Sequence, residues 1–254
     1  MRLIWMLICT ALALPAGAAA TPAAESYASA LQRWARVLDS HVDTNGAVNF
    51  AGLARAPQDL QAFVDYIARV SPESAPEAFP TPDSRLAYHI NAYNALAMYN
   101  VIDSGLPESL AGLRKIPFFV FKRFRIGGRS MSLYTYENDV IRKMGDERVH
   151  FALNCMSVGC PQLPREPFVA ERLQTQLERE ARRFFADPRH LQRDDAKREV
   201  RASEILDFYT EDFLRRDPDL ITYINRHAPQ PVPADYRVRF IDYDWTVKAQ
   251  AVRR

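Results

Sequence analysis

Residues 148–164 read RVHFALNCMSVGCPQLP, a strongly apolar run that leads into a short loop with two cysteines. Along residues 148–154, apolar side chains would face both sides of an extended chain, which is typical of a strand buried on two faces. We therefore expect a central buried strand at about 148–154, with His150 inside the protein. A chemical centre is expected where this strand opens into the loop.

The composition limits the class of protein. The chain has 254 residues, of which 48% are hydrophobic and 25% are charged, so it is long enough to bury a sizeable core as one globular domain. Its 33 basic and 31 acidic residues leave a net charge of +2. Averaged over the chain, this charge gives no electrostatic case for binding nucleic acid or an anionic membrane.

The first twenty residues have the features of a cleavable secretory signal peptide. Arg2 precedes the apolar run Leu3–Leu14, which is followed by Pro15 and the small residues Ala18–Ala20. The run is shorter than the about 20 apolar residues that span a bilayer. We therefore expect residues 1–20 to be removed and residues 21–254 to form a single periplasmic or secreted domain without a transmembrane segment.

Helical periodicity recurs along most of the remaining chain. The expected helices cover, in order, residues 25–41, 57–70, 83–104, 134–144, 170–185, 203–214 and 220–226. Gly127-Gly128 joins two extended segments in an expected β-hairpin, and the chain alternates as a strand near residue 238. The pattern predicts an α+β fold, with a small, mostly antiparallel sheet around the central strand and several helices about it.

The expected hairpin is basic on one side. Its basic residues are Lys122, Arg123, Arg125 and Arg129. Such a strip is typical of a solvated edge.

Two amide side chains interrupt the apolar face of the helix expected at residues 83–104. On a helical wheel of about 100° per residue, Asn91 and Asn94 lie at the edge of the apolar arc. A buried amide without a partner costs on the order of 1–3 kcal/mol. These amides should therefore bond to backbone across the core or line a cleft. His89 falls on the opposite side of the wheel, where we expect it to be partly exposed.

Cys155 and Cys160 are the two cysteines that would remain after signal cleavage. An oxidising compartment would allow them to form a disulfide that closes a small loop. Alternatively, one of them is a nucleophile at a strand end. In an extended chain His150 is a poor base for Cys155, because their Cα atoms would lie about 16 Å apart and their side chains on opposite faces.

The spacing of His150, Cys155 and Cys160 also invites comparison with a zinc site. Structural zinc sites favour more closely spaced ligand pairs, and a fourth ligand would have to come from elsewhere. We therefore expect no metal and no cofactor.

Short motifs follow one another over nearly the whole mature chain. They are Asn91-Ala92-Tyr93-Asn94-Ala95-Leu96, Gly127-Gly128 with Ser132-Leu133 and Glu137, His150-Phe151-Ala152-Leu153-Asn154-Cys155 through Cys160-Pro161, Phe208-Tyr209 with Asp212-Phe213, and Tyr243-Asp244-Trp245. This series resembles the domain of unknown function 547 family, found in exported bacterial proteins and in plants. The resemblance implies a single α+β domain and names no activity.

The resemblance also bears on individual residues. The family includes members in reducing compartments, which implies that the two cysteines are more than a disulfide. Family members usually have a Glu-His pair after the hairpin, where this chain has Glu137-Asn138. If that histidine is the family's catalytic base, this chain is impaired or uses another group.

Two classes of function remain open at this level. The first is a thiol-dependent hydrolase or transferase acting on peptide-like amides, with Cys155, Cys160, Glu137 and His150 as candidate catalytic residues. The second is a non-catalytic periplasmic binding or assembly module in which Cys155 and Cys160 form a disulfide.

We also hypothesise that three distant segments meet in one cleft: the helix with Asn91 and Asn94, the Cys155–Cys160 loop and the Tyr243-Asp244-Trp245 end. We expect Asn91, Asn94 and Asp244 to bind a peptide-like or small-molecule ligand there, with Asn91 or Asn94 bonding the backbone of the cysteine loop. The partner itself cannot be read from the sequence.

Overall fold

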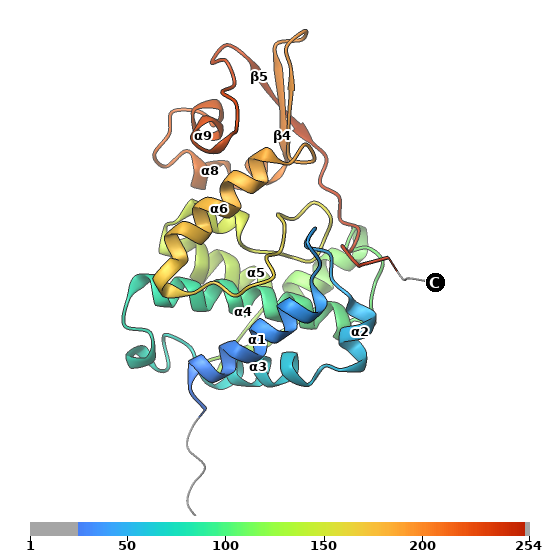
Figure 1. Ribbon diagram of the computed structural model, residues 1–254, viewed down its shortest axis with the longest axis vertical. Coiled ribbons are helices and arrows are strands. Elements are labelled where there is room, and N and C mark those ends of the chain that lie inside the picture. Colours follow the sequence, from blue (N-terminus) through green and yellow to red (C-terminus); the bar gives the residue numbers. More distant parts are fainter. Residues whose placement is uncertain (1–24, 252–254) are drawn as a thin grey trace, which may run out of the picture.

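The computed structural model describes residues 25–251, and the expected signal peptide lies outside them. Helices form most of the described part (Figure 1). The larger ones are α1 (Tyr27–His41), α2 (Phe50–Arg55), α3 (Gln58–Arg69), α4 (Pro82–Asp103), α6 (Leu173–Ala186) and α9 (Leu220–His227). The shorter helices are η1 (Pro76–Ala78), α5 (Leu133–Tyr136), η4 (Glu137–Ile141), η5 (Arg142–Met144), η6 (Glu147–Phe151), η7 (Ala170–Arg172), α7 (Ile205–Phe208) and α8 (Thr210–Phe213). The predicted α+β class is confirmed.

Helix α4 is the centre of the helical part. It begins at a capping box, in which the Thr81 hydroxyl accepts from the Ser84 N–H and the Ser84 hydroxyl accepts from the Thr81 N–H. Helix α3 packs between α1 and α4, and Trp34 of α1 stacks on Phe63 of α3 with ring centroids 5.8 Å apart. Fifteen of the 22 residues of α4 are buried, so the helix has no broad solvent face.

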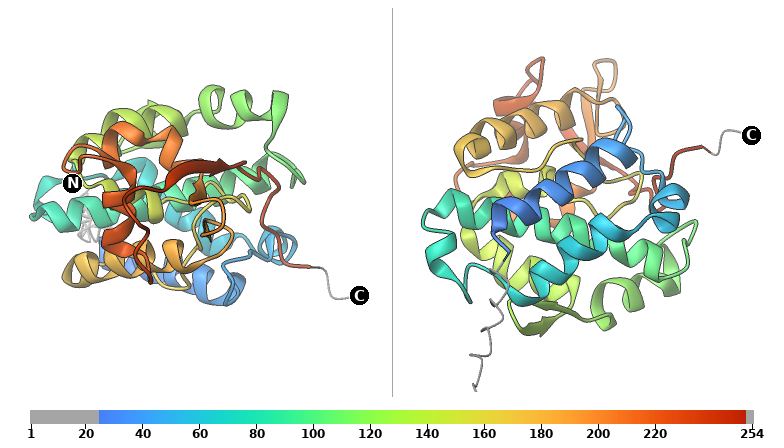
Figure 2. Two further views of the ribbon diagram at one scale, coloured as in Figure 1. Left: turned by 90° about the horizontal axis from the view of Figure 1, so that it is seen from above. Right: turned by 60° about the horizontal axis from the view of Figure 1, so that its bottom comes forward.

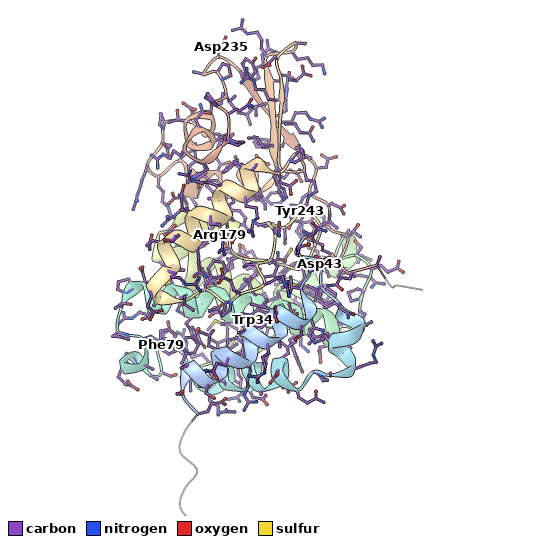
Figure 3. All side chains as sticks on the ribbon, in the orientation of Figure 1. Trp34, Asp43, Phe79, Arg179, Asp235 and Tyr243 are labelled. Carbon is purple, nitrogen blue, oxygen red and sulfur yellow. The ribbon has the colours of Figure 1, made fainter. Side chains whose placement is uncertain are left out.

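The described strands form two small sheets. Strands β1 (Phe124–Ile126) and β2 (Arg129–Met131) make the predicted antiparallel hairpin. Strands β3 (Leu191–Asp194), β4 (Glu199–Ser203) and β5 (Arg237–Ile241) form a sheet in the order β3-β4-β5, antiparallel and then parallel. This second sheet rises to an apex near Asp235 (Figure 3).

The hairpin is held against the end of α3 by its turn. The N–H groups of Gly127 and Gly128 donate to the carbonyls of Ile67 and Ala68 at 2.8 Å. A side chain at Gly127 would place its Cβ 2.2 Å from the Ser71 hydroxyl, and φ there is +54°. Both facts require glycine at this position.

The expected central strand at 148–154 is wrong. Residues Glu147–Phe151 form the 3₁₀ helix η6, which begins where the Asp146 carboxylate accepts from the Arg148 N–H. Val149, His150 and Phe151 are buried as expected. A short, largely apolar run indicates burial without specifying the backbone conformation. The strand that lies between two others is β4, from Glu199 to Ser203.

A separate segment projects at the edge of the molecule. It consists of η2 (Gly112–Arg114) and η3 (Pro117–Phe121), shown in green in Figure 2. In the described part of the chain, no helix combines the length and apolar character that crossing a membrane requires.

Candidate active site

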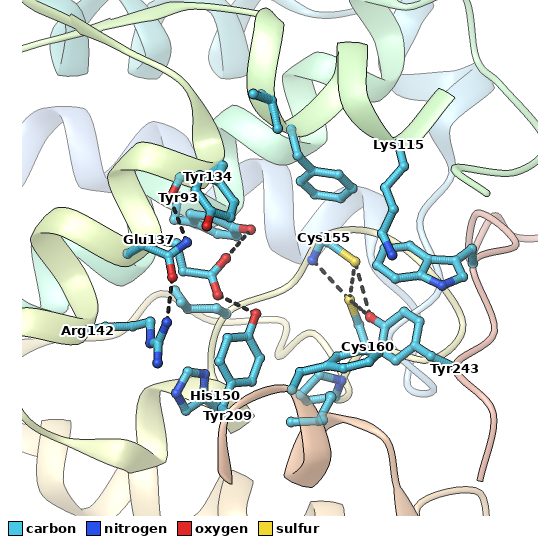
Figure 4. Close-up of a pocket in the computed structure, with 18 of the residues that line it drawn as sticks. Tyr93, Lys115, Tyr134, Glu137, Arg142, His150, Cys155, Cys160, Tyr209 and Tyr243 are labelled. Atoms are coloured by element: carbon cyan, nitrogen blue, oxygen red, sulfur yellow. Dashed lines mark hydrogen bonds between the residues drawn. The ribbon is translucent and has the colours of Figure 1, made fainter. Parts of the chain in front are cut away.

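A pocket of about 480 Å³ lies between the cysteine loop and the segments around it (Figure 4). Its lining comes from α4 (Tyr93), the η2–η3 segment (Lys115, Ile116, Phe119, Val120), α5 to η5 (Tyr134, Glu137, Asn138, Arg142), η6 and the cysteine loop (His150, Leu153, Cys155, Cys160, Pro161), α7 (Ile205, Phe208, Tyr209) and the C-terminal segment (Tyr243, Trp245). All four candidate catalytic residues, Cys155, Cys160, Glu137 and His150, therefore line one pocket.

The start of the cysteine loop is held by two asparagines. The Asn94 side chain donates to the Ala152 carbonyl at 2.9 Å and accepts from the Asn154 N–H at 2.7 Å. Asn154 in turn donates to the Pro161 carbonyl and accepts from the Met156 N–H. The loop is thus tied to α4 at one end and closed on itself by a single amide.

Asn91 makes the same kind of contact elsewhere. Its side chain donates to the Phe168 carbonyl at 2.7 Å and accepts from the Phe168 N–H at 3.0 Å. Neither Asn91 nor Asn94 lines the pocket. Both side chains bond backbone across the core, and Asn94 alone reaches the residues that precede the cysteines.

The C-terminal segment runs alongside the cysteine loop. The N–H groups of Val158 and Gly159 donate to the carbonyls of Thr246 and Asp244, both at 2.8 Å. A Cβ at Gly159 would lie 2.9 Å from the Tyr243 ring, so glycine allows that ring to pack on the loop. The Asp244 side chain is exposed and accepts from the Thr246 N–H. The structure therefore brings Tyr243 into the pocket, while the side chain of Asp244 stays outside it.

The two cysteines are free thiols with their sulfur atoms 2.7 Å apart. The Cys155 N–H donates to the Cys160 sulfur at 3.0 Å. The Tyr243 hydroxyl lies 3.2 Å from the Cys155 sulfur and 3.0 Å from that of Cys160. The Ser157 hydroxyl is 3.0 Å from the Cys155 sulfur. The sulfur pair is thus surrounded by hydrogen-bonding groups at the wall of the pocket.

These contacts separate the pKa values of the two thiols. Burial opposes ionisation of Cys160, but hydrogen bonds from Cys155, Tyr243 and Ser157 outweigh it and lower the pKa of Cys160 to about 6. Burial, together with the hydrogen bond to Cys160 and the negative charge there, raises the pKa of Cys155 well above its usual value. At neutral pH the pair therefore holds one proton, with the thiolate on Cys160.

Glu137 occupies a second polar cluster in the same pocket. One carboxylate oxygen accepts from the Tyr93 hydroxyl at 2.9 Å, and the other accepts from the Tyr209 hydroxyl. Burial and the negative charge of Glu137 raise the pKa of both tyrosines, so both remain donors. Asn138 bonds to the Tyr134 carbonyl and to Arg142, at the edge of this cluster.

His150 contacts the Glu137 cluster through the ring of Tyr209. Its Nε2–H donates to the Asp212 carboxylate at 2.8 Å, and its ring stacks on Tyr209 with centroids 3.8 Å apart. Arg142 also donates to Asp212 at 2.6 Å. Burial opposes the charge on Asp212, yet hydrogen bonds from His150 and Arg142 lower its pKa. Figure 4 shows His150 beside Arg142 and Tyr209, well apart from the cysteines.

The expectation of a partly exposed His89 is wrong. Its side chain is only 2% exposed. Nδ1 bonds to the Tyr136 hydroxyl at 2.8 Å, and Nε2 lies 3.3 Å from the Glu73 carboxylate. His89 is therefore a core residue with both nitrogens occupied, and it takes no part in the pocket.

Sequence reasoning gave no role to Tyr93, Tyr209, Tyr243, Arg142 or Asp212. A signal was present for Tyr243, because alternation along an extended segment places it on the same side as Trp245 and opposite Asp244. For the others, the contacts join residues far apart in the chain and left no local pattern. Among residues 25–251, no three His, Cys, Asp or Glu side chains are grouped as metal ligands would be.

Fold and site together define an α+β protein with a dithiol at the wall of a partly apolar pocket. Residues 78–185 match the family described as "Protein of unknown function, DUF547". The segment includes Asn94, Glu137 and both cysteines, whereas Tyr209 and Tyr243 follow it. No curated protein and no solved structure matches the chain significantly.

Proposed function

We propose that the protein is a thiol-dependent hydrolase or transferase acting on peptide-like amides, with Cys155 as nucleophile and Cys160 as its base. The observation that carries the proposal is the 2.7 Å contact between the two sulfurs, in which the Cys160 sulfur also accepts from the Cys155 N–H. A nucleophile in direct contact with a base is the arrangement that activates a thiol. No histidine is needed for this pair.

The proton moves between the sulfurs during the reaction. Cys155 is half-buried, whereas Cys160 is only 2% exposed, so Cys155 is the better placed to meet a substrate. As the Cys155 sulfur bonds to the amide carbonyl carbon, its proton passes to the Cys160 thiolate. The C–N bond then breaks, and Cys160 returns the proton to the leaving nitrogen. The acyl group remains on Cys155 as a thioester until water or an amine accepts it.

The Glu137 carboxylate can accept hydrogen bonds from the N–H groups of a peptide-like substrate. Tyr93 and Tyr209 each donate to one carboxylate oxygen, and each oxygen retains a lone pair for an N–H donor. His150 holds the Tyr209 ring by stacking and is anchored by Asp212. In this proposal Glu137 binds substrate, and His150 is a positioning residue.

The test uses a mixture of unblocked di- and tripeptide amides with the reduced protein. We expect release of amine and an acyl adduct on Cys155 in intact-mass spectra after acid quenching. Cys155→Ser should abolish both, and Cys160→Ser should lower kcat by about 10²–10⁴-fold, the usual contribution of a general base. Arg216→Gln, a change at an exposed position outside the pocket lining, is the control. Turnover that survives Cys155→Ser would exclude the mechanism.

A second candidate rests on the same sulfur contact. Two thiols this close need little movement to form a disulfide, and an oxidised pair would leave a non-catalytic binding or assembly module. Titration of free thiols in protein isolated without reductant separates the candidates. Two titratable thiols support the enzyme, and none supports the binding module.

The compartment is part of the proposal. We infer from residues 1–20 that the protein is exported. Mass spectrometry of the exported protein should find an N-terminus near Thr21, and an intact Met1 would exclude this.

A further inference from the structure

The mouth of the pocket is bordered by exposed apolar side chains. The large hydrophobic residues that are exposed in the described part are Leu106, Leu113, Ile116, Val120, Phe121, Tyr134 and Phe208. Four of these seven line the pocket, and two more belong to the η2–η3 segment. Leu113 is 93% exposed and Phe121 is 70% exposed. Monomeric soluble proteins rarely expose such a cluster unless it contacts a partner.

The same region is strongly basic. Residues 109–132 contain six Lys or Arg and no Asp or Glu, in a chain whose 33 basic and 31 acidic residues nearly balance. Lys122 pairs with Asp103, whereas Arg114, Lys115, Arg125 and Arg129 make no salt bridge to any described residue. The small net charge of the whole chain therefore conceals a strongly basic stretch at residues 109–132.

Apolar and basic side chains are interleaved at the pocket mouth. Leu113 and Ile116 flank Arg114 and Lys115 in the sequence, and the Lys115 ammonium lies 3.8 Å from the centre of the Trp245 ring. Aromatic rings with a polar edge, cations and exposed aliphatic groups together are the composition of a surface that inserts at a lipid headgroup boundary. Two copies of this chain would instead bring like charges together.

We propose that the η2–η3 segment docks on the surface of a bilayer containing anionic phospholipid, so that the pocket opens toward the membrane. Leu113, Ile116 and Phe121 enter the headgroup boundary, and the unpaired basic residues contact lipid phosphates. The sequence analysis interpreted the basic hairpin residues as a solvated edge. In this proposal they supply part of the electrostatic attraction to the membrane. The docking does not depend on the chemistry proposed for the thiols.

The test is sedimentation with lipid vesicles. Residues 21–254 are used, because they keep every described residue and lack the apolar run Leu3–Leu14. We expect the protein to bind vesicles of phosphatidylcholine and phosphatidylglycerol in equal parts and to bind pure phosphatidylcholine weakly. Added salt should weaken binding to the mixed vesicles, because it screens the charges.

Variants assign the binding to the segment. Leu113→Ser with Phe121→Ser should lower the partition coefficient at least tenfold, as expected for two apolar side chains that no longer insert. Arg114→Gln should lower it about fivefold. Arg216→Gln, which removes an exposed arginine between α8 and α9, should leave it unchanged. All four altered side chains are exposed, so the urea unfolding midpoint should not move.

Several results would overturn the proposal. They are a failure to bind the mixed vesicles, equal binding to neutral vesicles, or undiminished binding by the double variant. Self-association that the double variant abolishes, without vesicle binding, would identify the surface as a contact between copies of the chain and would equally overturn it.

Discussion

The backbone N–H of Cys155 donates to the sulfur of Cys160 at 3.0 Å, while the two sulfur atoms lie 2.7 Å apart. Burial opposes ionisation of Cys160, but hydrogen bonds from Cys155, Tyr243 and Ser157 lower its pKa to about 6. In the proposed mechanism, the loop itself supplies the base that a histidine provides in other thiol sites. The proposed mechanism therefore needs no base from His150, whose Nε2 is engaged by Asp212.

Tyr243→Phe should raise the pKa of Cys160. The substitution removes a hydroxyl 3.0 Å from the Cys160 sulfur and keeps the ring that packs on Gly159. Loss of a hydrogen bond to an anion should move the pKa of about 6 upward by about one unit. The rate of alkylation by iodoacetamide as a function of pH measures the change. Tyr209→Phe is the matched control, because its hydroxyl bonds Glu137, and it should leave the thiol titration in place.

Asn94→Ala should disturb both stability and the thiols. It leaves the Ala152 carbonyl and the Asn154 N–H buried without their partner, at a cost of about 1–3 kcal/mol for each group. Asn91→Ala removes the same two kinds of bond to Phe168. Urea unfolding should show similar losses for both variants, whereas only Asn94→Ala should shift the thiol titration. Identical titrations would mean that Asn94 does not position the loop.

Phe151→Ala should be among the most destabilising single changes. Phe151 is fully buried and packs on Phe184, Phe185 and Phe213. Truncating a buried aromatic residue costs about 3–5 kcal/mol. Phe121→Ala, at an exposed position, should change the free energy of unfolding by less than about 0.5 kcal/mol. Near-wild-type stability of Phe151→Ala would contradict the described core.

His190 should make the protein less stable in mild acid. Its ring is buried against Phe184, its Nε2 has no described partner, and burial lowers its pKa from 6.5 to about 4. Below pH 6.5 His190 binds a proton in the unfolded chain but stays neutral in the folded protein. Stability is therefore lost as the pH falls from about 6.5 to about 4, by at most about 3 kcal/mol. His190→Gln should flatten that part of the stability profile, and an unchanged slope would argue against the role of His190.

The sequence predicted where side chains are buried better than how the backbone runs. Val149, His150 and Phe151 are buried as expected, yet they form a 3₁₀ helix. A short, largely apolar run is compatible with a buried strand and with a buried helical turn. The hairpin at Gly127-Gly128 was predictable because only glycine adopts its two positive φ values easily. The residues of a turn determine its backbone conformation. The backbone conformation of a short apolar run depends instead on the tertiary contacts around it.

The helical wheel failed at His89 for a related reason. A wheel assigns polar residues to a solvent face, but α4 is contacted by α2, α3, α5, α6 and η7. His89 is therefore buried and satisfied by Tyr136. For Asn91 and Asn94 the same wheel left backbone bonding or a cleft open, because a buried amide must find partners in any environment, and both side chains bond backbone.

For the site, the sequence identified the cysteine loop and Glu137 and missed the tyrosines around them. Tyr93 and Tyr209 are distant in sequence and meet only at Glu137. A long-range contact of this kind has no periodic signal. Asp244 was chosen from its motif, yet an extended backbone directs Tyr243 inward and Asp244 outward.

The central claim is that the Cys155–Cys160 pair holds one proton at neutral pH. Alkylation of the reduced protein by iodoacetamide across a pH series, with the adduct located by peptide mass spectrometry, tests it most directly. We predict one adduct per chain, on the more exposed Cys155 as its proton passes to Cys160, with a midpoint near the pKa of about 6 of Cys160. Two independent adducts, or a midpoint near the ordinary thiol value of 9.0, would contradict the account.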